Sequence, residues 1–144
     1  MIKNIPDSLQ DHILPFNWDV SRVWGLNACT ERIERTQLDY LLKLPLWSSV
    51  PGKGMLFDIS PLEVIRDSAK YPHQTSRVQK ADTFYPIDLL VFNRKIWILD
   101  GVHRIAKLYV MKQSELSARY HSPNCIPNIV KANNILLPTQ RARG

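Results

Sequence analysis

The segment from residue 86 to residue 112 constrains the fold more than any other part of this chain. Two short runs rich in β-branched and aromatic residues, 87–92 and 96–99, flank Asn93-Arg94-Lys95, which predicts two strands joined by a tight turn. Asp100-Gly101 ends the second strand, and apolar residues then recur at helical spacing over 102–112. A strand–turn–strand unit followed directly by a helix predicts an α+β protein.

The residues before residue 60 predict one helix and one strand. A helix is expected over 36–43, with Thr36 as its N-cap and Leu38, Leu41 and Leu42 on one face. Pro45 should end this helix, because the residue before a proline is pushed out of the α region. Residues 55–59 alternate as in a short strand.

A capping box marks the start of the next helix. Ser60 is the expected N-cap, Pro61 stands at the first helical position, and Glu63 can bond back to the Ser60 amide. We expect this helix to run to about residue 69 and to end before Pro72. A short helix is expected over 76–81 and a last strand over 126–130.

The length of 144 residues predicts a single domain. We divide it into an N-terminal arm and helix over 1–54, a core over 55–131 and a basic tail over 132–144. No apolar run approaches the roughly 20 residues that a bilayer requires, so no membrane partner is expected. Two cysteines and no signal pattern at the N-terminus predict a cytoplasmic protein without disulfides. The four histidines lack metal-ligand spacing, so no metal site is expected.

The positive charge lies in the second half of the chain. Residues 1–70 hold 8 Lys/Arg and 9 Asp/Glu, whereas residues 71–144 hold 11 and 4. A basic half favours a phosphate-bearing partner, either a nucleotide or a nucleic acid, and charge alone does not choose between them. The loop Pro51-Gly52-Lys53-Gly54 does not have the ending of a Walker phosphate loop, and no helix is expected after it.

The turn Asp100-Gly101-Val102-His103-Arg104 has the layout of a phosphate site. The first amides of a helix are unpaired and carry the positive end of its dipole. Asp100 could cap the helix, Gly101 would leave room for a phosphate to approach, and Arg104 could bind phosphate oxygens. His103 adds a hydrogen-bond donor or a catalytic base. An ordinary capped turn with a solvated His-Arg pair explains the same residues.

The stretch from Asp100 to Lys107 resembles the DG-x-HR-xx-A signature of the ParB/sulfiredoxin-like superfamily. The residues before it, His73, Arg77, Ala81-Asp82 and Pro86-Ile87, are similar to those that precede the signature in small bacterial ParB-like proteins. The resemblance covers residues 55–131. It implies a small mixed sheet flanked by helices, with a nucleotide's phosphates on the N-terminus of the signature helix.

The resemblance also implies a set of site residues. A nucleoside di- or triphosphate (ATP, ADP or CTP, with Mg²⁺) would be bound by Asp100, Gly101, Val102, His103, Arg104, His73, Arg77 and Asp82. His103 is the catalytic candidate. His73 and Arg77 lie four apart and would form a phosphate clamp on a helix, or else belong to a solvated loop. Asp82 would cap a turn, orient Arg104 or hold Mg²⁺ through water.

Departures from the signature narrow the activity. Val102 occupies the position of the catalytic cysteine of sulfiredoxins, so sulfiredoxin chemistry is not expected. The chain continues for only 40 residues after Arg104, which argues against the DNA-binding domain that partition proteins carry next. Our first hypothesis is therefore a nucleotide-binding ParB-like domain with slow ATP hydrolysis or phosphotransfer. The alternatives are a nucleic-acid-binding or nuclease module and a protein-interaction adaptor.

Overall fold

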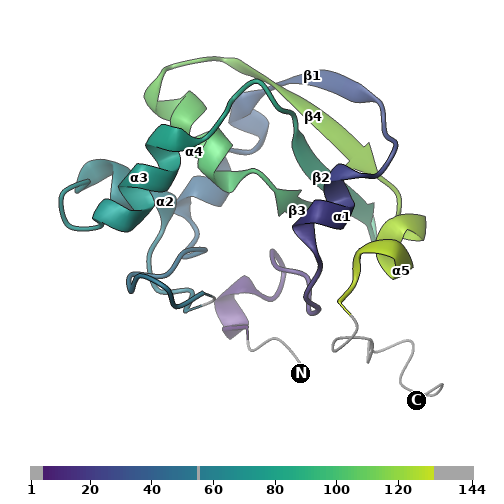
Figure 1. Cartoon of the computed structure of the whole chain (residues 1–144), viewed down its shortest axis with the longest axis horizontal. Coiled ribbons are helices and arrows are strands. Elements are labelled where there is room, and N and C mark those ends of the chain that lie inside the picture. Colours follow the sequence, from purple (N-terminus) through teal and green to yellow (C-terminus); the bar gives the residue numbers. More distant parts are fainter. Residues whose placement is uncertain (1–4, 55, 132–144) are drawn as a thin grey trace. The chain divides into compact units, whose positions relative to one another are not determined.

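The computed structural model describes residues 5–54 and 56–131, and Figure 1 shows the order of the elements along the chain. The protein is a mixed α/β structure with a four-stranded sheet of order β1-β4-β2-β3. Its contacts divide the chain into two compact units. Within the described residues, unit 1 comprises 5–29, 88–100 and 120–131, and unit 2 comprises 30–54, 56–87 and 101–119. The α+β class is confirmed, and the single domain stays a prediction.

Unit 2 contains an antiparallel strand pair and most of the helices. Strand β1 (Thr30–Glu34) pairs with β4 (Glu115–His121), from Thr30 opposite Arg119 to Glu34 opposite Glu115. Neither strand was expected from the sequence. In β4 the buried Leu116 and Ala118 alternate with more exposed, mostly polar residues, a short period-two signal that polar side chains obscure.

The helix expected after Ser60 begins where its capping box predicts but ends at Arg66 rather than near residue 69, and the helix expected over 76–81 begins earlier, at Pro72. Helix α2 (Pro61–Arg66) has the full capping box, since Ser60 Oγ accepts from the Glu63 amide and Glu63 accepts from the Ser60 amide. Helix α3 (Pro72–Lys80) lies beside α4 (Val102–Val110) (Figure 1). Pro72 begins α3 rather than only ending α2, because proline suits the first helical turn, where its missing N–H costs nothing.

Several expected elements differ from the structure. The helix expected over 36–43 is instead two 3₁₀ turns, η2 (Arg35–Gln37) and η3 (Asp39–Lys43), although Leu38, Leu41 and Leu42 are buried as expected. The prediction of a strand over 55–59 was wrong, because Phe57 has a φ of 53°, which interrupts an extended strand. The described part of this stretch contains only an isolated β-bridge between Ile59 and Trp47. Residue 55 lies outside the described residues.

Unit 1 is built on the expected hairpin and on the N-terminal arm. Strands β2 (Ile87–Phe92) and β3 (Lys95–Asp100) pair antiparallel across a turn in which Asn93 and Arg94 both have positive φ. The arm contributes η1 (Asp7–Leu9) and α1 (Val20–Trp24). After η4 (Pro123–Cys125), the strand expected over 126–130 is instead a helix, α5 (Ile126–Ile129).

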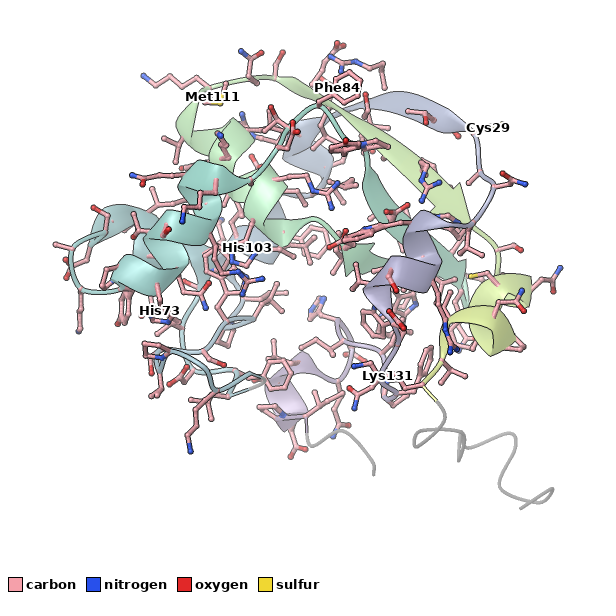
Figure 2. All side chains as sticks on the ribbon, viewed as in Figure 1. Cys29, His73, Phe84, His103, Met111 and Lys131 are labelled. Carbon is pink, nitrogen blue, oxygen red and sulfur yellow. The ribbon has the colours of Figure 1, made fainter. Side chains whose placement is uncertain are left out.

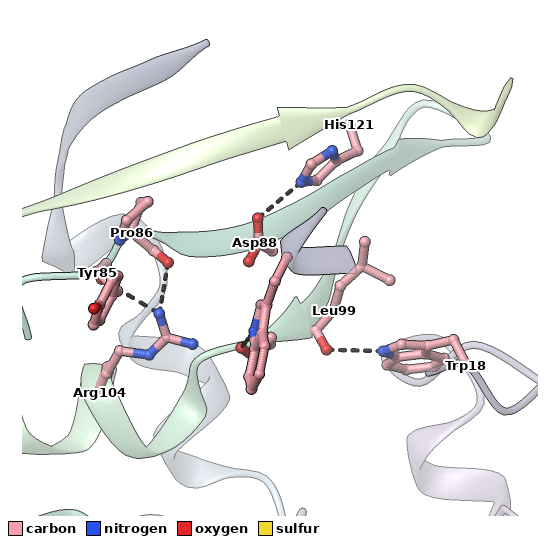
Figure 3. Close-up of polar contacts among 9 residues, drawn as sticks. Trp18, Tyr85, Pro86, Asp88, Leu99, Arg104 and His121 are labelled. Carbon is pink, nitrogen blue, oxygen red and sulfur yellow. Dashed lines mark hydrogen bonds and ion pairs between the residues drawn. The ribbon is translucent and has the colours of Figure 1, made fainter. Parts of the chain in front are cut away.

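The core of unit 1 buries the hairpin against the arm and α5. Its buried members are Leu14, Phe16, Val23, Leu90, Trp97, Leu99, Cys125, Ile126 and Ile129. The Trp18 indole packs at its edge and donates to the Leu99 carbonyl at 2.9 Å (Figure 3). His121 and Asp88 form a buried pair with Nε2 and Oδ1 2.8 Å apart (Figure 3). None of the described helices has the length and apolar character needed to span a bilayer.

Candidate functional site

The turn before α4 is shaped by packing, not by a side-chain cap. Gly101, not Asp100, is the N-cap residue, with a φ of 127°. A Cβ at this position would lie 2.5 Å from Cγ2 of Ile87, so glycine is required by the neighbouring side chain and by the backbone conformation. The N-cap position expected for Asp100 is therefore corrected to Gly101, and packing against Ile87 accounts for this glycine without a phosphate.

The Asp100 carboxylate has a partner in the N-terminal arm. Its Oδ2 accepts from Nε1 of the Trp24 indole at 2.9 Å. This contact ties helix α1 to the end of strand β3 within unit 1. Asp100 thus has a structural role that sequence spacing did not indicate, because its partner lies 76 residues away.

Two cations of helix α4 bind backbone carbonyls. Nη1 of Arg104 donates to the carbonyl oxygens of Tyr85 and Pro86, at 3.3 and 2.6 Å (Figure 3). Nζ of Lys107 donates to those of Gln79 and Ala81, at 2.7 and 2.9 Å. These bonds hold the segment between α3 and β2 against α4, so the Arg104 Nη1 that was expected to bind phosphate contacts the protein's own backbone.

The Asp82 carboxylate has one of the three roles expected for it, the capping of a turn. Its Oδ1 accepts from the Phe84 amide at 3.0 Å, which closes a short turn in the segment between α3 and β2. Capping a turn is therefore the role that the structure supports for this carboxylate.

His103 lies in the first turn of α4 and is mostly enclosed. Its ring stacks on the Trp47 indole, with centroids 4.1 Å apart and planes 9° apart. Its Nε2 lies 2.8 Å from Oε1 of Gln74. Burial, and then the positive charge of Arg77, lower the pKa of His103 from its usual 6.5 to about 3. His103 is thus neutral at physiological pH.

Gln74 fixes the hydrogen bonding of His103. Its amide nitrogen donates to the Ser48 carbonyl at 3.1 Å, which leaves its amide oxygen to accept from Nε2 of His103. Nε2 of His73 lies 3.1 Å from the same Ser48 carbonyl. Helix α3 and His103 together therefore hold the loop that contains Ser48.

A cavity of about 310 Å³ opens between that loop and α3. It is lined by residues 46–48 and 50–54 on one side, and by His73, Gln74 and Arg77 of α3 on the other. Arg77 and Lys53 are exposed and make no side-chain hydrogen bond or ion pair within the described part of the chain. None of the described residues that line the cavity carries a carboxylate. The cavity therefore has an apolar floor from residues such as Leu46 and Trp47, and the formal charges on its lining are the positive ones of Arg77 and Lys53.

The structure brings together part of the expected site. His73 and Arg77 line the cavity, and His103 lies behind it through its contacts with Trp47 and Gln74. Figure 2 labels both histidines, His73 on α3 and His103 on α4. Gly101, Val102, Arg104 and Asp82 are in the same unit but do not line this cavity.

Sequence reasoning missed the loop over 46–54. Lys53 lies between two glycines, in a loop that lacks the ending of a Walker motif and therefore does not indicate a phosphate site by that pattern. The combination of a lysine with flanking glycines was the available signal, since small residues leave backbone amides accessible. Its relation to Arg77 depends on tertiary contacts with α3.

No protein-family model, curated protein or solved structure matches this chain. The resemblance to the ParB/sulfiredoxin-like superfamily therefore depends on the motif residues alone. Among the described residues, no group of three or more His, Cys, Asp or Glu side chains could hold a metal ion.

Proposed function

We propose that the cavity of unit 2 binds the phosphate groups of a nucleoside di- or triphosphate in a ParB/sulfiredoxin-like fold. The observation that carries the proposal is the pair of uncommitted cations, Arg77 and Lys53, in a cavity without a lining carboxylate. Phosphate is the small-ligand group best matched to two cations and a glycine-containing loop. The motif resemblance, and its place on a strand–turn–helix unit, support a nucleotide as the source of the phosphate.

Arg77 and Lys53 approach the ligand from opposite walls. Arg77 projects from α3 and can present two parallel N–H groups to phosphate oxygens, whereas Lys53 offers a point charge on the loop. The volume of about 310 Å³ lies at the lower end of the roughly 300–1,000 Å³ range of small-molecule sites. We infer that phosphates occupy the cavity and that the nucleoside extends from its mouth.

His103 acts in this proposal as a positioning residue. A histidine with a pKa of about 3 releases any proton it accepts, so it is a poor general base at pH 7. Its bond to Gln74, and the bond of Gln74 to Ser48, instead hold the loop that carries Lys53. Hydrolysis or phosphotransfer stays a prediction.

The lining does not supply the ligands that Mg²⁺ prefers. Mg²⁺ is bound through carboxylate oxygens and phosphates, and no lining residue has a carboxylate. The proposal therefore assigns no magnesium ligand to this chain, and the two cations neutralise the phosphate charge.

Thermal stability with and without nucleotides tests the proposal. ATP, ADP or CTP should raise the melting temperature of the full chain, whereas adenosine and cytidine should not, because they lack phosphates. Calorimetry should show that Arg77→Gln weakens nucleotide binding by roughly 10- to 100-fold, since a charge-assisted hydrogen bond is lost.

A matched variant separates local recognition from net charge. Arg66 is an exposed arginine in the last turn of α2 and does not line the cavity. Arg66→Gln removes the same charge and should leave nucleotide affinity within about two-fold, because exposed charges are screened by salt. The cavity would be excluded as the nucleotide site if Arg77→Gln and Arg66→Gln lost the same amount of nucleotide affinity. It would also be excluded if no nucleotide raised the melting temperature of the wild-type chain.

A further inference from the structure

Two neighbouring aromatic side chains stand in solvent between α3 and β2. Phe84 is 83% exposed and Tyr85 is 60% exposed, and their rings lie edge to face with centroids 5.4 Å apart. A phenylalanine is normally among the most buried residues, and here two aromatic rings are exposed side by side, which makes the pair a candidate contact surface. Figure 2 shows Phe84 and His73 well apart on unit 2.

The backbone beneath these rings is firmly held. Arg104 donates to the carbonyls of Tyr85 and Pro86, and Asp82 accepts from the Phe84 amide. The rings are therefore presented by a fixed segment, and binding through them would not require a disordered loop to become ordered. Such preorganisation favours affinity because less conformational entropy is lost.

The surroundings of the two rings are basic. Lys107 and Arg104 are half-buried at the carbonyls of the same segment, and the exposed Lys80 ends helix α3 two residues before Asp82. Asp82, whose carboxylate accepts the Phe84 amide, is the acidic residue of this segment, and the three cations outnumber it. Two aromatic rings flanked by positively charged side chains are complementary to a partner that has both flat apolar faces and negative charges.

We propose that Phe84 and Tyr85 form a stacking platform for the unpaired bases of a single-stranded nucleic acid, with the exposed Lys80 facing its phosphates. Arg104 and Lys107 stay bonded to backbone carbonyls and add only to the positive potential of the surface. Base stacking on aromatic side chains combined with a basic surface is the general mode of single-strand recognition. The site is separate from the nucleotide cavity and does not depend on it, since neither ring lines that cavity.

The small apolar area argues against a stable protein partner. The residues before the rings, Asp82 and Thr83, are polar, so the apolar surface that this segment offers consists of two rings. A stable protein interface buries about 800 Å² on each partner, several times the area of two rings. Two bases, by contrast, need no more than one ring face each.

Fluorescence anisotropy with the full chain tests the platform. The probe is a labelled oligonucleotide of about 20 thymidines, with a duplex of equal length for comparison. We expect binding to the single strand that weakens steeply with salt, and weaker binding to the duplex, whose bases are already stacked. Phe84→Leu should weaken single-strand binding by roughly 5- to 100-fold, whereas Phe84→Trp should keep it, because leucine is apolar but has no aromatic face.

Charge variants and folding controls complete the experiment. Lys80→Gln should weaken binding and reduce its dependence on salt, and Lys43→Gln, an exposed lysine of η3, should do so less. Circular dichroism confirms that each variant is folded. The proposal is overturned if the wild-type chain does not bind the single strand, if it prefers the duplex, or if Phe84→Leu binds as well as Phe84→Trp, the result that a hydrophobic protein-docking surface would give.

Discussion

Replacing Gly101 by alanine tests whether packing or phosphate access explains this glycine. The added Cβ would lie 2.5 Å from Cγ2 and 2.8 Å from Cβ of Ile87, and 3.3 Å from the Ile87 Cα. Ile87 is 1% exposed and cannot move aside into solvent. The φ of 127° is also a conformation that residues with a Cβ rarely adopt.

Both effects destabilise the folded state. A strained backbone conformation costs about 1–3 kcal/mol, and overpacking a core costs about 1–3 kcal/mol, so Gly101→Ala should lower the free energy of unfolding by about 2–6 kcal/mol. The total stability of a domain is about 5–15 kcal/mol, so the variant should remain partly or fully folded in the absence of denaturant.

Urea denaturation of a double-mutant cycle with Ile87→Ala measures the steric part. Ile87→Ala alone should cost about 2–5 kcal/mol, and it should cost at least about 1 kcal/mol less in the Gly101→Ala background, because the Cγ2 contact is gone. A loss below about 1 kcal/mol for Gly101→Ala, or strict additivity of the two changes, would refute the packing argument. Weaker nucleotide binding by folded Gly101→Ala, at unchanged stability, would instead support phosphate access.

Three further changes test other contacts. The pKa of His103 is about 3 in the folded chain and about 6.5 in the unfolded chain, so lowering the pH protonates the unfolded chain first. The free energy of unfolding of the wild type, measured by urea titration, should therefore fall by about 2 kcal/mol between pH 7 and about pH 5. His103→Gln should lack this part of the pH dependence. Arg94→Gly should stabilise the protein by about 0.5–1 kcal/mol in the same assay, because both turn residues have positive φ and glycine adopts it without strain; a loss of stability would contradict that geometry. Arg104→Gln should lower the free energy of unfolding by about 1.5–3 kcal/mol and leave nucleotide affinity, measured by calorimetry, unchanged. Unchanged stability with weaker nucleotide binding would instead show that Arg104 contacts the nucleotide.

The elements that could be predicted are those whose signals are local. The capping box at Ser60 and Glu63 involves residues three apart, and the hairpin follows from alternation on both sides of Asn93-Arg94-Lys95. The structure shortens the expected turn by one residue, because β3 begins at Lys95. Helix α4 follows from apolar residues at a spacing of three and four. The expected strand over 55–59 failed because Phe57 adopts a positive φ, which alternation does not reveal.

The partners of the charged groups were decided by the tertiary structure. The four-residue spacing of His73 and Arg77 allowed a shared helix face, with a solvated loop as the alternative, and the structure places both on α3. The sequence did identify the strand–turn–helix unit that leads to His103 and Arg104. It did not show that Arg104 donates to the Tyr85 and Pro86 carbonyls, or that Asp100 accepts from an indole 76 residues away. Residue type determines what a side chain can bind, whereas its actual partner depends on which distant segment the packed core brings within hydrogen-bond distance. The cavity between α3 and the loop over 46–54 exists for the same reason, and no local pattern could have specified it.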